Sequence, residues 1–138
     1  SFNRNLFFCQ TKEGVLKSEF TYFPFPRLER GRRNFGVTID SLLDIAVNKL
    51  FTIYQRTTSR DYVDLYFIIK NYGLSVSDLI TKARAKFDWH IDFLQLGTQF
   101  IRAAEVKDYP RMIKTLDEKE LSDFFTAEAA KLKSEIIE

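Results

Sequence analysis

The sequence is poor in the residues that build metal and redox sites, with one cysteine, one histidine and one methionine in 138 residues. The single cysteine excludes a disulfide within the chain and a zinc site made of several cysteines. The single histidine leaves one candidate for any histidine-dependent triad. No run approaches the roughly 20 apolar residues of a membrane span, and nothing at the start has the pattern of a signal peptide. We therefore expect a soluble, cytoplasmic protein.

Glycine-rich nucleotide-binding patterns are also missing, since the sequence holds no G-x-G-x-x-G and no G-x-x-x-x-G-K-[ST]. The net charge of +2 is too small to identify a nucleic-acid-binding protein by itself. Hydrophobic residues, at 45%, and aromatic residues, at 15%, are plentiful. Such apolar surface offsets the entropy of ordering, and the length suits one ordinary globular domain. Composition predicts a globular unit and leaves its chemistry open.

The first 40 residues have the pattern of a small β structure. Residues 5–11 and 15–23 are rich in aromatic and β-branched residues, and the short glycine-containing turn between them favours a β-hairpin. Two prolines end the second strand, because proline cannot donate a ladder hydrogen bond. A basic loop over residues 27–33 and a short strand over residues 35–39 are expected to follow.

From residue 41 onward the apolar spacing is helical. Ser41 suits an N-cap, with Asp44 near the positive end of the helix. Further helices are expected to begin after Thr58 or Ser59, at Ser75 or Ser77, near His90 and after Pro110. The residues expected to face inward are Leu43, Ala46, Leu50, Ile53, Tyr54, Tyr62, Leu65, Tyr66, Ile69, Tyr72, Leu79, Ala83, Phe87, Ile91, Leu94, Ile101, Ala104, Leu121, Phe124, Phe125, Leu132 and Ile136. The sequence predicts an α+β chain, with a β piece over residues 1–40 and a helical region over residues 41–138.

Charged residues on the first two predicted helices have a spacing that brings them together. Lys49 and Arg56 are seven residues apart and point the same way on one helix, whereas Asp61 and Asp64 share a face of the next. Arg60 lies four residues before Asp64. In an antiparallel helical hairpin these side chains would form a cluster suited to a polyphosphate, with lysine as a point charge and arginine as a bidentate fork. An ion-pair network that only sets the angle between the helices is the structural alternative.

Two further groups in the β piece are candidates for binding. Glu19, on a strand face, is a candidate metal-ligating carboxylate, or else a solvated or paired one. The basic loop contains Arg27, Arg30, Arg32 and Arg33, which could grip the phosphates of RNA or remain a solvated loop.

The helical motif resembles that of the nucleotidyltransferase AbiEii/AbiGii toxin family. The resemblance rests on the string Ser41-Leu-Leu-Asp-Ile-Ala-Val-Asn-Lys-Leu50, on Arg56, and on Arg60-Asp-Tyr-Val-Asp-Leu-Tyr-Phe67. It continues over residues 15–20, 83–87, 100–110 and 117–125, and so covers most of the chain.

This resemblance implies a polymerase-β-like nucleotidyltransferase domain followed by a helical region. Family members are toxins of type IV toxin–antitoxin and phage abortive-infection systems, and some transfer nucleotides from NTPs to tRNA 3′ ends with Mg²⁺. By resemblance, Lys49 would bind the triphosphate, Asp64 would support the site with Asp61 as a second candidate, and Glu19 would be the third metal carboxylate. A cognate antitoxin protein is the implied partner.

The sequence departs from the family in one respect, because it lacks a Gly-Ser motif followed by spaced aspartates. Two-metal transfer needs several carboxylates, and Glu19 alone cannot hold two cations. We therefore expect a fragment or a shortened relative that is inactive as given. The alternatives are a non-catalytic module that binds RNA or an antitoxin, and a helical protein whose charges only brace the fold. Exposed phenylalanines on an unpaired sheet edge would favour a homodimer.

Overall fold

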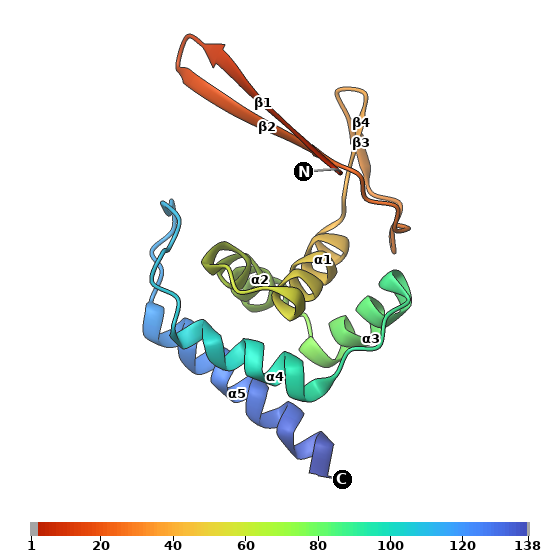
Figure 1. Cartoon of the computed structure of the whole chain (residues 1–138), viewed down its shortest axis with the longest axis vertical. Coiled ribbons are helices and arrows are strands. Elements are labelled where there is room, and N and C mark those ends of the chain that lie inside the picture. Colours follow the sequence, from red (N-terminus) through yellow and green to blue (C-terminus); the bar gives the residue numbers. More distant parts are fainter. Residues whose placement is uncertain (1–2, 138) are drawn as a thin grey trace.

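The computed structural model describes residues 3–137 and shows two β-hairpins beside a bundle of helices (Figure 1). The strands are β1 (Arg4–Thr11), β2 (Gly14–Thr21), β3 (Arg32–Asn34) and β4 (Val37–Ile39). The helices are α1 (Leu42–Gln55), α2 (Ser59–Tyr72), α3 (Val76–Phe87), α4 (Phe93–Ile101), a short 3-10 turn (Arg102–Ala104) and α5 (Glu118–Ile137). The α+β class predicted from the sequence is confirmed. None of the described helices combines the length and the apolar character needed to span a membrane.

The hairpins form two separate two-stranded antiparallel sheets. The first matches the sequence prediction, with Arg4 opposite Thr21 at its base. The second corrects it, because Phe35 and Gly36 have positive φ angles of 50° and 77° and form the turn. The expected strand over residues 35–39 therefore begins at Val37, and residues 32–34 of the expected basic loop are a strand.

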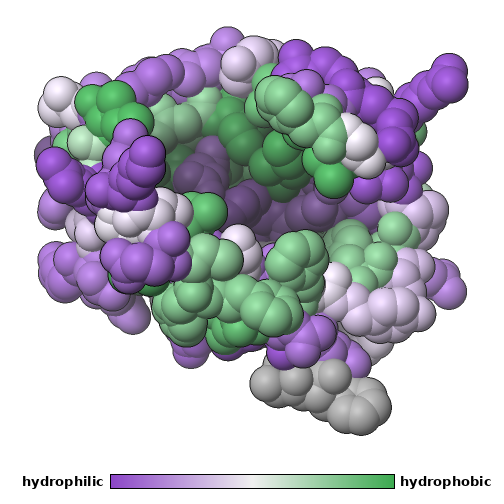
Figure 2. Space-filling view, turned by 90° about the horizontal axis from the view of Figure 1, so that it is seen from above, coloured by the Kyte–Doolittle hydropathy of each residue, from purple (hydrophilic) through white to green (hydrophobic). Residues whose placement is uncertain are grey.

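The first hairpin leaves large aromatic side chains uncovered. Phe7, Phe8 and Phe20 are 53%, 70% and 64% exposed. Figure 2, which looks at the molecule from the side of the hairpins, shows exposed hydrophobic groups around a central hollow. A two-stranded sheet cannot cover its own faces, so this apolar surface follows directly from the small size of the sheet.

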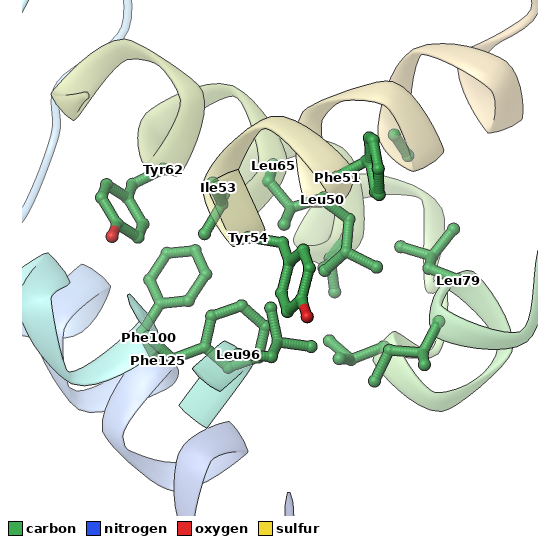
Figure 3. Close-up of a cluster of buried hydrophobic side chains, with 14 of the residues drawn as sticks. Leu50, Phe51, Ile53, Tyr54, Tyr62, Leu65, Leu79, Leu96, Phe100 and Phe125 are labelled. Carbon is green, nitrogen blue, oxygen red and sulfur yellow. The ribbon is translucent and has the colours of Figure 1, made fainter. Parts of the chain in front are cut away.

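The core lies between the helices, with side chains from all five of them (Figure 3). Its largest fully buried side chains are Tyr62, Phe100, Phe125, Leu50, Ile53, Leu65, Leu79, Ile91, Leu96 and Leu121. Ser41 caps α1 and Ser75 caps α3, each accepting a hydrogen bond from the backbone N–H three residues on. Gly73 ends α2 in the left-handed conformation, as its position in the sequence predicts.

The predicted inward face of the fourth helix was partly wrong. The helix begins after Asp92 rather than at His90, because the Asp92 carboxylate accepts the N–H groups of Leu94 and Gln95 at 2.7 and 3.4 Å. With that start Leu96 and Phe100 face the core. The residues that were expected inside and are exposed are Tyr72, Leu94, Ile101, Ala104 and Ile136.

The segment between the two hairpins is anchored to the helices by aromatic contacts. The ring of Phe25 packs edge-on against that of Phe87 at the end of α3, with centroids 4.8 Å apart. Phe87 stacks in turn on Phe51 of α1, at 4.0 Å and 10°. Phe23 adds a second edge-on contact to Phe87 at 6.0 Å. These aromatic contacts attach the chain that follows the first hairpin to the core.

Candidate functional site

The helical hairpin of α1 and α2 brings three charged side chains into direct contact. Lys49 Nζ lies 3.0 Å from Asp61 Oδ1 and 2.8 Å from Asp64 Oδ2. Arg56 follows the last residue of α1 and is extended, so it does not continue the face of Lys49. Its guanidinium lies 3.9 Å from Asp61 Oδ2. Lys49 therefore meets Asp61 and Asp64 as the residue spacing predicts, whereas Arg60 forms no ion pair among the described residues. We call Lys49, Arg56, Arg60, Asp61 and Asp64 the charged cluster.

Lys49 is held in a fixed place with its charge intact. Burial lowers the pKa of its ammonium group, but hydrogen bonds and charge from Asp64 and Asp61 outweigh burial, so the pKa lies above its usual value. An ammonium group has three N–H donors, and the two carboxylates take two of them. The third donor remains for a ligand. Thr58 donates its hydroxyl to the Asp61 carboxylate and fixes that acceptor as well.

A polar cavity of about 630 Å³ adjoins this cluster. We call it the cluster pocket; its lining residues are Lys49, Arg56, Thr57, Thr58, Ser59, Arg60, Asp61, Val106, Lys107, Asp108 and Pro110. One wall comes from the start of α2, and the other from the chain after α4. Ser59 ties the walls together by donating its hydroxyl to the carbonyl of Asp108. This second wall could not be predicted from the sequence, because 49 residues separate Ser59 from Asp108.

A second ion pair, between Asp44 and Lys86, is fully buried. Lys86 Nζ lies 2.8 Å from Asp44 Oδ1, and their side chains are 1% and 0% exposed. The carboxylate also accepts the backbone N–H groups of Leu28 at 2.9 Å and of Glu29 at 3.0 Å. Burial raises the pKa of Asp44, but the hydrogen bonds from Leu28, Lys86 and Glu29 outweigh it, so the pKa lies below its usual value. The sequence pattern placed Asp44 in the first helical turn and did not reveal this role.

The Asp44 contacts hold the start of the arginine-rich segment, residues 27–33, against α1. Within it, Arg27 pairs with Asp40 at 2.6 Å. Arg33 donates to the carbonyl of Gly36 at 2.8 Å across the β3–β4 turn. Arg30 and Arg32 form no ion pair within residues 3–137. Two of the four arginines thus have their charged groups available for a ligand.

The candidate metal ligand Glu19 lies in β2 of the exposed first hairpin, and among the described residues it forms no ion pair with the charged cluster. Its carboxylate is 3.4 Å from Arg4 and 3.8 Å from Lys17. The carboxylates of the charged cluster are occupied by Lys49. Across the described part of the chain no three His, Cys, Asp or Glu side chains gather as metal ligands do. These donors do not fit a Mg²⁺ site, because each carboxylate already has a cation as its partner.

A protein-family model covers the charged cluster and the arginine-rich segment. The model of the family described as "Nucleotidyl transferase AbiEii toxin, Type IV TA system" matches residues 13–135. An uncharacterised protein of Aquifex aeolicus (strain VF5) is 31% identical over 80 residues, which are 56% of this chain and 38% of that protein. The match therefore spans less than half of the relative. No solved structure matches.

Proposed function

Since this chain belongs to the AbiEii family of nucleotidyl transferase toxins of type IV toxin–antitoxin systems, we propose that it binds the substrates of such a transfer. The substrates are an NTP, held at the charged cluster, and an RNA acceptor, for which we favour tRNA. NTPs and tRNA are found together in the cytoplasm, where we place its action. The convergence of Lys49, Arg56 and Arg60 around one polar cavity is the observation that carries this proposal.

The chemistry of the cluster pocket suits a triphosphate. Lys49 presents one free N–H donor from a rigid position, since Asp61 and Asp64 hold the other two. Arg56 and Arg60 line the same cavity and can bind phosphate oxygens in a bidentate manner. We assign Asp61 and Asp64 the role of positioning Lys49. An ion-pair network that only braces the fold would hold Lys49 in the same way. Binding of a ligand therefore distinguishes a triphosphate site from such a network.

The arginine-rich segment supports an RNA-binding role. Arg27 and Arg33 stabilise the segment by their contacts with Asp40 and Gly36. Arg30 and Arg32 are the two that we propose contact RNA phosphates. Contacts of this kind position a nucleic acid and carry no sequence information.

We propose further that the chain binds its substrates but does not transfer nucleotides by itself. Glu19 is paired with Arg4 and Lys17 on the first hairpin, and none of the ion pairs of the charged cluster includes it. Mg²⁺ would be the cofactor of a complete enzyme, with its carboxylate ligands supplied from outside residues 3–137. A non-catalytic module that binds RNA or an antitoxin protein is the second candidate, and the absence of a metal-ligand group within the described residues favours it.

The family description supports a place in a toxin–antitoxin system. We propose that a cognate antitoxin protein controls the toxin and that the system acts in abortive infection by phage. The exposed aromatic side chains of β1 and β2 would be covered in a homodimer, which we propose as the assembly of the chain.

Binding and transfer assays test the proposal separately. We expect NTP binding by isothermal titration calorimetry, weakened about tenfold or more in Arg60→Gln because a hydrogen bond to a charged group is lost. Lys82→Gln, on the exposed face of α3, is the matched control and should leave NTP binding unchanged. Labelled NTPs with Mg²⁺ and total tRNA should give no transfer.

Each outcome has a definite meaning. Transfer of label by the chain would refute the proposed inactivity and would show that the catalytic carboxylates are within it. Absence of NTP binding by the folded protein would refute the assignment of the cluster pocket. Binding of RNA without any NTP binding would favour the non-catalytic module.

A further inference from the structure

A second polar pocket shares Arg56 and Thr57 with the cluster pocket. It measures about 400 Å³ and lies between the C-terminal end of α1 and one face of α4. We call it the Arg102 pocket; its lining residues are Tyr54, Gln55, Arg56, Thr57, Gln95, Thr98, Gln99 and Arg102. Because Arg56 and Thr57 line both pockets, the two pockets adjoin at this stretch of chain.

The Arg102 pocket is built on a buried side chain. Gln99 is 6% exposed, and its amide nitrogen donates to the carbonyl of Ile53 at 2.7 Å. The amide oxygen accepts a hydrogen bond from Arg102 Nη1 at 3.0 Å. The Gln99 backbone carbonyl accepts the Tyr62 hydroxyl at 2.6 Å. Gln99 is therefore fixed on three sides, and it fixes the guanidinium of Arg102 in turn.

Arg102 retains donors for a ligand. A guanidinium has five N–H donors, and Gln99 takes one of them. Arg102 forms no ion pair with any described residue, and it is exposed. The pocket lining holds two arginines and no carboxylate. The two arginines give this lining a formal charge of +2, equal to that of the cluster pocket, where four cations face two aspartates, so both pockets attract an anion.

We propose that the Arg102 pocket binds a phosphodiester of an RNA strand that passes over Arg56 from the cluster pocket. The inference rests on the proposed function and extends it, because it makes an oligonucleotide rather than a nucleotide alone the ligand of the joined pockets. The polar side chains of Gln95 and Thr98 suit the sugar and base edges of such a strand. The lining lacks the exposed aromatic anchors that a protein partner would use.

The test compares a short single-stranded RNA with an NTP on the same variants. Arg102→Gln should weaken RNA binding about tenfold, because one charge-assisted contact is lost, and should leave NTP binding unchanged. It should also reduce the slope of log affinity against log salt by about 0.7, the value for one phosphate contact to a single strand. Arg102→Lys should keep the salt slope. Arg111→Gln, which lines neither pocket, is the matched control.

The outcomes separate this inference from the proposed function. Unchanged RNA affinity and salt slope in Arg102→Gln would overturn the inference, while RNA and NTP binding by the unaltered protein would still support the proposed function. Equal losses for RNA and NTP would also overturn it, since the pocket would then belong to the nucleotide site. Failure of the unaltered protein to bind either ligand would refute the proposed function, and the inference with it. Circular dichroism of each variant verifies that it is folded.

Discussion

Replacement of the buried lysine, Lys86→Met, should destabilise the protein strongly. Both partners of the Lys86–Asp44 pair are almost wholly buried. Removing one partner of a buried pair leaves an uncompensated charge and typically costs about 3–5 kcal/mol. The carboxylate keeps the N–H donors of Leu28 and Glu29, so we expect the lower end, about 3 kcal/mol. Natural domains have about 5–15 kcal/mol in total, and such a loss is a large fraction of it.

The same helix supplies a matched control. Lys82 pairs with Asp78 at 2.7 Å, nearly the distance of the Lys86 pair, but these side chains are 34% and 53% exposed. Lys82→Met should cost no more than about 0.5 kcal/mol, because exposed helical pairs contribute little. Burial is therefore the main difference between the two substitutions.

Urea denaturation followed by circular dichroism measures both free energies of unfolding. A cost below about 1 kcal/mol for Lys86→Met, or equal costs for the two lysines, would refute the reasoning from burial. The double variant Asp44→Asn/Lys86→Met should recover part of the loss, since it leaves no buried charge. If the free-energy costs of Asp44→Asn and Lys86→Met simply add in the double variant, the two side chains are not coupled.

Further predictions concern pH, a glycine and the assembly. The pKa of Asp44 is lowered on folding, so its contribution is present above the unfolded value of about 3.9 and is lost as pH falls through the folded value; urea titrations below pH 4 should show this loss, and Asp44→Asn should not. Gly31→Ala would place a Cβ atom 2.6 Å from the carbonyl oxygen of Ile39 and should reduce amide protection in the β3–β4 hairpin. In Gly36→Ala the added Cβ would have no atom within 4 Å, so only backbone strain remains and amide protection should fall less. Light scattering should detect a dimer at high concentration that Phe8→Ser weakens, and a monomer at every concentration would refute the proposed homodimer.

Local periodicity accounts for the parts of the fold that the sequence predicted. The helical hairpin and its charged cluster follow from the three-residue spacing of Asp61 and Asp64 and from the apolar stripe beside Lys49, because both patterns lie within single helices. The left-handed cap at Gly73 is a similarly local signal. Such features depend on neighbours in the sequence, and the sequence therefore specifies them directly.

Contacts between distant residues could not be predicted in this way. Asp44 and Lys86 are 42 residues apart, and neither has a local pattern that distinguishes a buried pair from two solvated charges. The hydrogen bond from Gln99 to the carbonyl of Ile53 joins residues 46 apart and was not expected either, because a glutamine has no preferred partner in a single sequence. One local signal was missed as well: the start of α4 was misplaced because the capping hydrogen bonds of Asp92 were not recognised, and the predicted inward face of α4 was partly wrong as a result.

The Asp44 contacts close a loop of chain without a covalent bond. The backbone of Leu28 meets the first turn of α1, 16 residues later, and the loop between them contains Arg30 and Arg32. Closing a loop in the free protein removes many of the conformations that its chain could otherwise adopt. The loop then loses less conformational entropy when a ligand binds these arginines. Affinity rises through preorganisation of the loop rather than through additional contacts.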